Sequence, residues 1–268
     1  MISRSRLWRR PWFWLALGLV LAALVAGVLL WLRRDATSAR IRESGVWRVG
    51  MDPSFPPFES IDPSTGRPVG LDVDLIDSIA GRWGVRAEIV SLGFDELVDA
   101  VAARRVDSAV SALPVFEWRT QEVSFSAPYI EAGVVLAVPR GSTIGSPEDL
   151  AGRRVAAEWG SEGDAQVREL QRRLEGRLEL VLRESADAAM EAVAGSQADA
   201  AVTDAVSLAL FNRDGGDLVA VGQPLRSDPY VVVVPKGAPL LLADLNQALA
   251  AMEADGTLTA LRAKWLGP

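Results

Sequence analysis

The segment 46–59, VWRVGMDPSFPPFE, is an apolar run that ends at an acidic residue and continues into a loop rich in proline and phenylalanine. Val46–Met51 has the composition of a short buried strand. Asp52 follows directly, and the loops after the strands of a parallel sheet border the crevice where ligands bind. The segment therefore predicts a strand that brings Asp52 to a ligand site, with a purely local role in the turn beside Pro53 as the alternative.

Strand and helix patterns alternate along the rest of the chain. This alternation predicts an α/β fold with parallel sheets covered by helices. Further strands are expected at 87–90, 108–111, 134–138, 154–158, 178–182 and 198–203, and helices at 73–83, 94–103, 164–174 and 186–194. The chain is expected to end in two helices, with Gly256 stopping the first of them.

Composition excludes several kinds of chemistry. The chain contains no cysteine and no histidine, which removes thiol nucleophiles, disulfides, histidine bases and the commonest zinc ligands. We therefore expect no metal site and no cofactor. Because residues 1–34 contribute six arginines and no acid to a net charge of −7, the remainder carries −13. A nucleic-acid partner is accordingly not expected.

The N-terminus contains an apolar run at 12–32, flanked on both sides by arginine. Its length suits a helix that crosses a bilayer, and tryptophans stand near its ends, as at a membrane interface. A cleaved signal peptide within 1–34 is the alternative, but its apolar region would usually be shorter and end at a small-x-small site. We expect an uncleaved anchor in the inner (cytoplasmic) membrane of a bacterial envelope, a polar linker at 35–43 and an extracytoplasmic domain.

A series of short motifs extends over residues 44–268. They are VGMDPSFPPFE (49–59), GLDVDL (70–75), FDEL (94–97), VD (106–107), Arg119, FSAPY (125–129), DLAGRRV (149–155), ADAAVTD (198–204), ADGTL (254–258) and KWLG (264–267). In order and spacing they resemble the family 3 extracellular solute-binding proteins, which include amino-acid-binding proteins of ABC transporters.

The resemblance implies a type II-like periplasmic-binding-protein fold with two lobes, each a mixed, mostly parallel sheet flanked by helices. Lobe 1 would comprise 44–131 and 231–268, and lobe 2 would comprise 135–222. Hinge crossovers would lie at 131–135 and 222–231, where the apolar runs 134–138 and 230–234 are expected to lie side by side. Ligand binding would then favour a closed state, because only that state contacts the ligand from both lobes.

The resemblance also implies a site for an amino acid or a close relative. A carboxylate and an ammonium leave water at low cost only when each meets an opposite charge and hydrogen bonds. At the family's positions, Arg119 would hold the carboxylate and Asp204 the ammonium. The alternatives are a surface role for Arg119 and a helix cap at Asp204.

Further residues at the family's positions complete the predicted site. Phe55 and Phe94 would cover the ligand, or else belong to the core. Ser111 would contact the ligand or only local backbone, and Ser161 would donate to a carboxylate or cap the following helix.

Some positions depart from the family pattern. Pro114 replaces a usual serine or threonine and has neither an N–H nor a hydroxyl group. Glu162 replaces a common threonine, so it would repel a ligand carboxylate unless it points away or binds a cationic group. Trp118 and Trp159 would extend an aromatic wall or pack on the lobe surface. These changes fit a cationic or aromatic amino acid, and equally a ligand that is not an α-amino acid.

We expect a binding protein that delivers its solute to an ABC permease. One alternative is a ligand-sensing subunit that acts on a partner membrane protein. Another is a periplasmic dehydratase-like enzyme on the same fold, for which Glu162 and Asp164 are acids near the predicted cleft. The catalytic glutamate of that branch would align best with Gly163, which has no side chain, so no catalytic residue and no enzyme activity are predicted.

Overall fold

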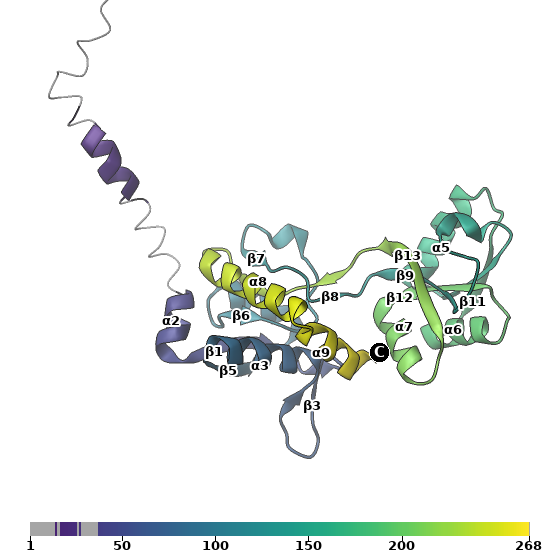
Figure 1. Ribbon diagram of the computed structural model, residues 1–268, viewed down its shortest axis with the longest axis horizontal. Coiled ribbons are helices and arrows are strands. Elements are labelled where there is room, and N and C mark those ends of the chain that lie inside the picture. Colours follow the sequence, from purple (N-terminus) through teal and green to yellow (C-terminus); the bar gives the residue numbers. More distant parts are fainter. Residues whose placement is uncertain (1–13, 15–16, 26, 28–36, 268) are drawn as a thin grey trace, which may run out of the picture.

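The computed structural model describes residues 14, 17–25, 27 and 37–267 of the chain. Two α/β lobes lie side by side and are joined by two narrow crossovers (Figure 1). Much of the predicted membrane segment 12–32 lies outside the described residues. Within the described part of the chain, none of the helices has the length and apolar character that crossing a membrane requires.

Lobe 1 is built on a five-stranded sheet with the order β5-β1-β6-β15-β7. Its strands are β1 (Val46–Met51), β5 (Arg86–Ser91), β6 (Ser108–Ala109), β7 (Val123–Phe125) and β15 (Val233–Pro235). Its helices are α3 (Leu71–Trp83), α4 (Phe94–Ala102), α8 (Pro239–Ala254) and α9 (Thr257–Leu266), with the short 3-10 helix η1 (Glu117–Arg119) before β7. A small sheet of β2 (Ser54–Phe55), β3 (Glu59–Ile61) and β4 (Pro68–Val69) extends from this lobe.

Lobe 2 repeats this plan with the strand order β11-β10-β12-β9-β13. Its strands are β9 (Val134–Pro139), β10 (Arg154–Glu158), β11 (Glu179–Arg183), β12 (Ala200–Asp204) and β13 (Leu218–Arg226). Its helices are α5 (Glu162–Arg173), α6 (Ala186–Ala194) and α7 (Ala205–Arg213), with the 3-10 helix η2 (Pro147–Leu150) before β10. The predicted strands and helices of both lobes are therefore confirmed, with ends shifted by a few residues.

The sheets are less parallel than predicted. In lobe 1, β1 runs parallel to β5 and β6, but β15 runs antiparallel to β6 and β7. In lobe 2, β10 runs parallel to β11 and β12, whereas β9 runs antiparallel to β12 and β13. The antiparallel strands lie next to the crossovers, where the chain enters or leaves a lobe without a helical return, so parallel pairing is not imposed on them.

The crossovers differ from the expected pairing of 134–138 with 230–234. β8 (Ile130–Glu131) pairs with β14 (Pro229–Tyr230), while β9 belongs entirely to the lobe 2 sheet. The Glu131 carboxylate accepts hydrogen bonds from the N–H groups of Gly133 (3.0 Å) and Asp228 (2.7 Å), which ties the two crossovers together. We therefore take β8 and β14 as the hinge.

The expected linker at 35–43 instead folds, from Thr37, into helix α2 (Thr37–Ser44). Ile41 is buried in the core of lobe 1, and Arg42 forms an ion pair with Asp244 of α8 (2.9 Å). The polar residues of α2 therefore form charge pairs on the surface of lobe 1 and do not make up a solvated linker.

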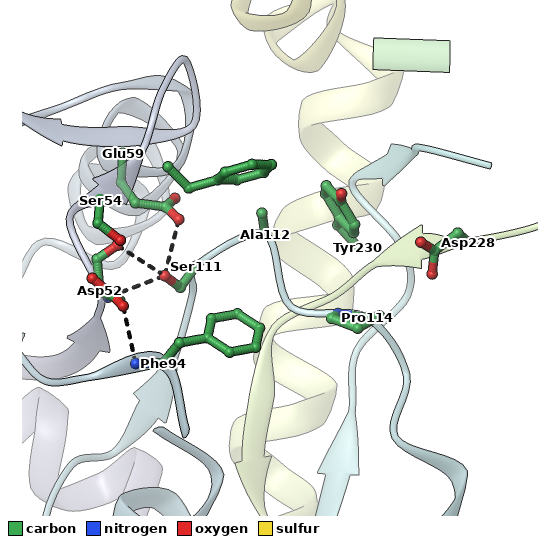
Figure 2. Close-up of a pocket in the computed structure, with 10 residues that line it drawn as sticks. Asp52, Ser54, Glu59, Phe94, Ser111, Ala112, Pro114, Asp228 and Tyr230 are labelled. Atoms are coloured by element: carbon green, nitrogen blue, oxygen red, sulfur yellow. Dashed lines mark hydrogen bonds between the residues drawn. The ribbon is translucent and has the colours of Figure 1, made fainter. Parts of the chain in front are cut away.

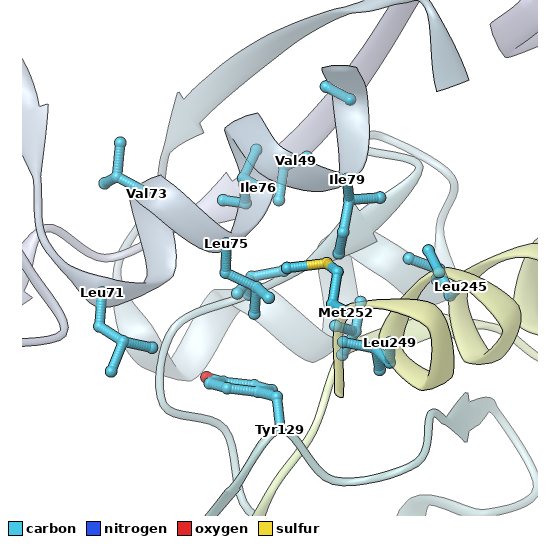
Figure 3. Close-up of a cluster of buried hydrophobic side chains, with 14 of the residues drawn as sticks. Val49, Leu71, Val73, Leu75, Ile76, Ile79, Tyr129, Leu245, Leu249 and Met252 are labelled. Atoms are coloured by element: carbon cyan, nitrogen blue, oxygen red, sulfur yellow. The ribbon is translucent and has the colours of Figure 1, made fainter. Parts of the chain in front are cut away.

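The main core of lobe 1 lies between its sheet and helices α3, α8 and α9 (Figure 3). Leu75 and Ile79 of α3 meet Leu245 and Met252 of α8 there. Gly256 follows α8 with a φ of 81°, a left-handed conformation that glycine adopts without strain, so it ends this helix as expected.

The two lobes also touch behind the hinge. Three residues of α7 in lobe 2, Val206, Ala209 and Leu210, pack against the main core of lobe 1. The Arg213 Nη1 donates to the backbone oxygen of Trp265 in α9 (3.2 Å). α7 of lobe 2 thus contacts lobe 1 directly, in addition to the two crossovers.

Candidate ligand-binding site

A cavity of about 360 Å³ opens in lobe 1, between the end of β1, the start of α4 and the second crossover (Figure 2). This volume suits a small molecule. Its lining residues are Asp52, Ser54, Phe55, Glu59, Phe94, Ser111, Ala112, Pro114, Asp228 and Tyr230. Four of the predicted site residues, Asp52, Phe55, Phe94 and Ser111, therefore lie together here.

Hydrogen bonds fix Asp52 beside the N-terminus of α4. Its Oδ2 accepts the backbone N–H of Phe94 (3.0 Å), and its own N–H donates to the Ser111 hydroxyl oxygen (3.0 Å), as Figure 2 shows. The position after β1 thus joins two loops, and the negative charge lies beside the start of a helix, where it is stabilised. Asp52 has both a local structural role and a place in the cavity wall.

Phe55 and Phe94 are not core residues, since 49% of Phe55 and 42% of Phe94 is exposed. Phe55 stacks on Phe58 with ring centroids 5.6 Å apart, and Phe58 meets Tyr230 edge-on at 5.4 Å. Aromatic rings therefore form an apolar wall beside the polar side chains of the cavity. A bound ligand would shield these rings from water.

A buried pair of carboxyl groups, Glu59 and Asp72, lies under the cavity, with only 1% of Glu59 and none of Asp72 exposed. Asp72 Oδ2 accepts from the Tyr129 hydroxyl (2.9 Å) and the Ala112 N–H (2.7 Å), and the Ser111 hydroxyl donates to Glu59 Oε1 (3.0 Å). Burial and the neighbouring Asp72 raise the pKa of Glu59 to about 10, while burial raises the pKa of Asp72 to about 6. The pair therefore keeps one proton at neutral pH.

The predicted lobe 2 residues Ser161, Glu162 and Asp204 line a separate hollow of about 60 Å³. Ser161 and Asp204 both cap helices: the Ser161 Oγ accepts from Asp164 N (3.1 Å) and Asp204 Oδ1 accepts from Ser207 N (2.7 Å). Both residues thus have the capping role, and their contact with a ligand stays a prediction. The structure places their polar atoms at two helix starts on the same side of the lobe.

Glu162 is paired with a cationic side chain. Its carboxylate lies 2.6 Å from Arg226 Nη1 and accepts from Gln166 Nε2 (2.9 Å), and these contacts lower its pKa. Arg226 belongs to β13, next to the second crossover. The negative charge that Glu162 introduces, where the family commonly has a threonine, is thus balanced by the positive charge of Arg226 in β13.

Arg119 does not line the cavity. Its Nη2 contacts the carboxylates of Asp99 and Glu122, the latter at 2.8 Å, and only 24% of its side chain is exposed. Two acids of the same lobe therefore balance its charge. The role of Arg119 as a carboxylate clamp stays a prediction.

The two flanking tryptophans are also outside the cavity lining. Trp118 is 77% exposed and meets Phe116 edge-on at 5.4 Å, while Trp159 is 74% exposed. This arrangement corresponds to the lobe-surface alternative for both residues.

Ser54, Glu59, Asp228 and Tyr230 were not predicted as site residues. Glu59 and Ser54 belong to the segment 46–59, so their position shortly after the first strand could have indicated that they lie near the site. Asp228 and Tyr230 come from a crossover about 170 positions further along the chain, and no local pattern connects them to the first strand.

The position of Gly163 bears on the dehydratase alternative. A Cβ atom at this residue would lie 2.5 Å from the backbone oxygen of Val202, so the backbone leaves no room for a side chain here. Within the described residues, no group of acidic side chains is arranged to hold a metal ion.

Two α/β lobes on a paired-strand hinge, with a polar and aromatic cavity beside that hinge, define a two-lobe solute-binding protein. Comparison with known families gives the same class, because residues 47–268 match the model for bacterial extracellular solute-binding proteins, family 3. The chain belongs to this family.

Relatives and solved structures agree with this assignment. The L-cystine-binding protein TcyJ of Escherichia coli (strain K12) is 26% identical over 255 residues, which cover 94% of each chain. The crystal structure of an ancestral cyclohexadienyl dehydratase is 29% identical with a TM-score of 0.74, covering 86% of this chain and 96% of its own. The L-cystine solute receptor of Neisseria gonorrhoeae in the unliganded open conformation has a TM-score of 0.75 over 85% of this chain and 96% of its own; at 23% identity, it supports the fold alone.

Proposed function

We propose that this protein binds a small polar solute, an amino acid or a related compound, on the outer side of the cytoplasmic membrane and delivers it to an ABC permease. The observation that carries the proposal is that the predicted site residues lie in two groups, one on each lobe. Asp52, Phe55, Phe94 and Ser111 line a cavity in lobe 1, and a second polar group lies on lobe 2. Relatives named as amino-acid-binding proteins support the class of solute.

Lobe closure would complete the site. Among the described residues, the lining of the lobe 1 cavity comes from lobe 1 and the crossovers, so a ligand bound there would keep one side exposed to water. Rotation about β8 and β14 would bring Ser161 and Asp204 against that side. Because the closed state alone contacts the ligand from both lobes, the ligand would stabilise it.

We expect the full-length protein to show a higher melting temperature with at least one member of a panel of amino acids, amines and organic acids. Binding to the folded state stabilises a protein by about 2.7 kcal/mol when the ligand is present at 100 times its Kd. Small-angle scattering with the same ligand should show a smaller radius of gyration. A panel in which no compound changes either quantity contradicts the proposal.

We further propose that residues 12–32 anchor the protein in the cytoplasmic membrane. The apolar run is long enough to cross a bilayer, and arginines stand on both sides of it. Membranes washed with alkaline carbonate should retain the protein, and mass spectrometry should find its N-terminal residues intact. Release into the wash with a start after residue 34 would identify a cleaved signal peptide instead.

A further inference from the structure

The charged residues that line the two hollows of the proposed site are acidic, and Arg226, which pairs with Glu162 at 2.6 Å, is a basic residue beside them. The lobe 1 cavity is lined by the carboxyl groups of Asp52, Glu59 and Asp228, and within the described chain no lysine or arginine lines it. The lobe 2 hollow is similar, because Glu158, Glu162 and Asp204 line it without a basic residue. Closure of the lobes would therefore surround a ligand with carboxyl groups.

Most of these carboxylates lack a cationic partner. Asp52, Asp204 and Asp228 form no ion pair with the lysines and arginines that the structure describes. Burial raises the pKa of Asp228, with Arg226 acting in the opposite direction. The protonated Glu59 adds no charge, but its Oε2 is buried at the cavity and has no hydrogen-bond partner among the described residues. A cationic ligand would offset the cost of keeping such groups away from water.

A ligand carboxylate, by contrast, would find no cationic donor among the described lining residues, and the side-chain donors there are the hydroxyl groups of Ser54, Ser111 and Tyr230. Ala112 has no hydroxyl group, and its N–H already donates to Asp72 (2.7 Å). Pro114 has no N–H, and the N–H groups of Asp52 and Phe94 are bonded to Ser111 and Asp52. Arg119 contacts Asp99 and Glu122, so it would have to leave two carboxylates to reach a ligand.

The aromatic wall suits the same kind of ligand. Phe55, Phe94 and Tyr230 line the cavity, and the faces of aromatic rings attract cations. Aromatic rings at the rim and carboxylates at the floor together match an ammonium or guanidinium group on a short carbon chain.

We infer that the ligand is an organic amine that carries one or two cationic groups and no carboxylate. This inference rests on the proposed function, because it specifies the solute of the same site. It separates this protein from binding proteins that recognise an amino acid through its carboxylate.

Two matched pairs of compounds test the inference by calorimetric titration of the full-length protein. Cadaverine is lysine without its carboxylate, and agmatine is arginine without its carboxylate. We expect at least one amine to bind about tenfold or more tightly than its amino acid, because the carboxylate would be desolvated without donors and near other carboxylates. Tighter binding of the amino acid in both pairs, or of an uncharged or anionic solute, overturns the inference and leaves the proposed function standing. If no compound of the wider panel binds, the proposed function itself fails.

Substitution of one cavity residue connects the result to this site. Asp228→Asn should weaken binding of the preferred amine about tenfold or more, since it removes a charge from the wall. Asp217→Asn is the matched control, because Asp217 lies on the surface and pairs with Arg140 (3.0 Å). Thermal melting of both variants without ligand verifies folding. Equal affinity in the two variants would contradict the placement of the amine at Asp228.

Discussion

Glu59→Gln should remove most of the pH dependence of stability between pH 6 and 9. In the wild type, burial and Asp72 raise the pKa of Glu59 from 4.5 to about 10. The folded protein therefore holds a proton that the unfolded chain releases above pH 4.5, and raising the pH favours unfolding. The stability associated with this proton is complete below pH 4.5 and is lost progressively until about pH 10.

One retained proton gives a slope of about 1.4 kcal/mol per pH unit, or about 4 kcal/mol between pH 6 and 9. The chain contains no histidine, so the other side chain of the buried pair, Asp72 with a pKa of about 6, contributes only near the lower end of this interval. Urea unfolding followed by circular dichroism at several pH values measures the slope. Gln at position 59 is nearly isosteric and carries no proton that titrates in this range.

Glu179→Gln is the matched control, because Glu179 is exposed on β11 and far from the buried pair. This variant should keep the wild-type slope. A wild type whose stability is flat from pH 6 to 9, or a Glu59→Gln variant with an unchanged slope, would show that the buried pair does not retain a proton.

Trp47→Ala should lower the free energy of unfolding of lobe 1 by about 3–5 kcal/mol. Trp47 is completely buried in β1, and its ring lies 4.9 Å from that of Trp83 in α3. Truncation to alanine leaves a large cavity between the first strand and the first long helix, which the surrounding backbone can fill only in part.

Trp118→Ala provides a comparison with the same change of side chain at a position that is 77% exposed. It should alter stability by no more than about 0.5 kcal/mol. Urea midpoints monitored by far-ultraviolet circular dichroism avoid dependence on the tryptophan signal. Similar losses in the two variants would mean that Trp47 is not the centre of packing that its burial indicates.

The sequence predicted most elements of the fold because their patterns are local. Apolar runs and helical spacing depend on residues a few positions apart, and they located β1, β10, α5 and α8 correctly. Helix α2 was missed for a related reason. Its one buried apolar residue, Ile41, and its charge partner Asp244 cannot be connected by a local pattern.

The site was predicted only in part. Asp52, Phe55, Phe94 and Ser111 were identified from their places after strands and within motifs, and the structure brings them together. Arg119 was predicted to bind the ligand carboxylate. In the structure its guanidinium contacts the carboxylates of Asp99, 20 positions earlier in the chain, and of Glu122. Which acid a basic side chain meets depends on how α4 and η1 pack, and this packing is not encoded in a short segment.

By itself, the sequence determined the two-lobe class, the order of its strands and helices, and the loops that lead to the site. The order of the elements follows from periodicity and from residues that must be buried or capped, whereas the two-lobe class and the site loops follow from the resemblance of the ordered motifs to the solute-binding family. Tertiary structure alone decided the chemistry of the cavity: that Asp228 and Tyr230 from a crossover close it, that Glu59 and Asp72 share a proton beneath it, and that no basic side chain among the described residues lines it. Charge and protonation depend on distances through space, and folding sets these distances between residues far apart in the chain.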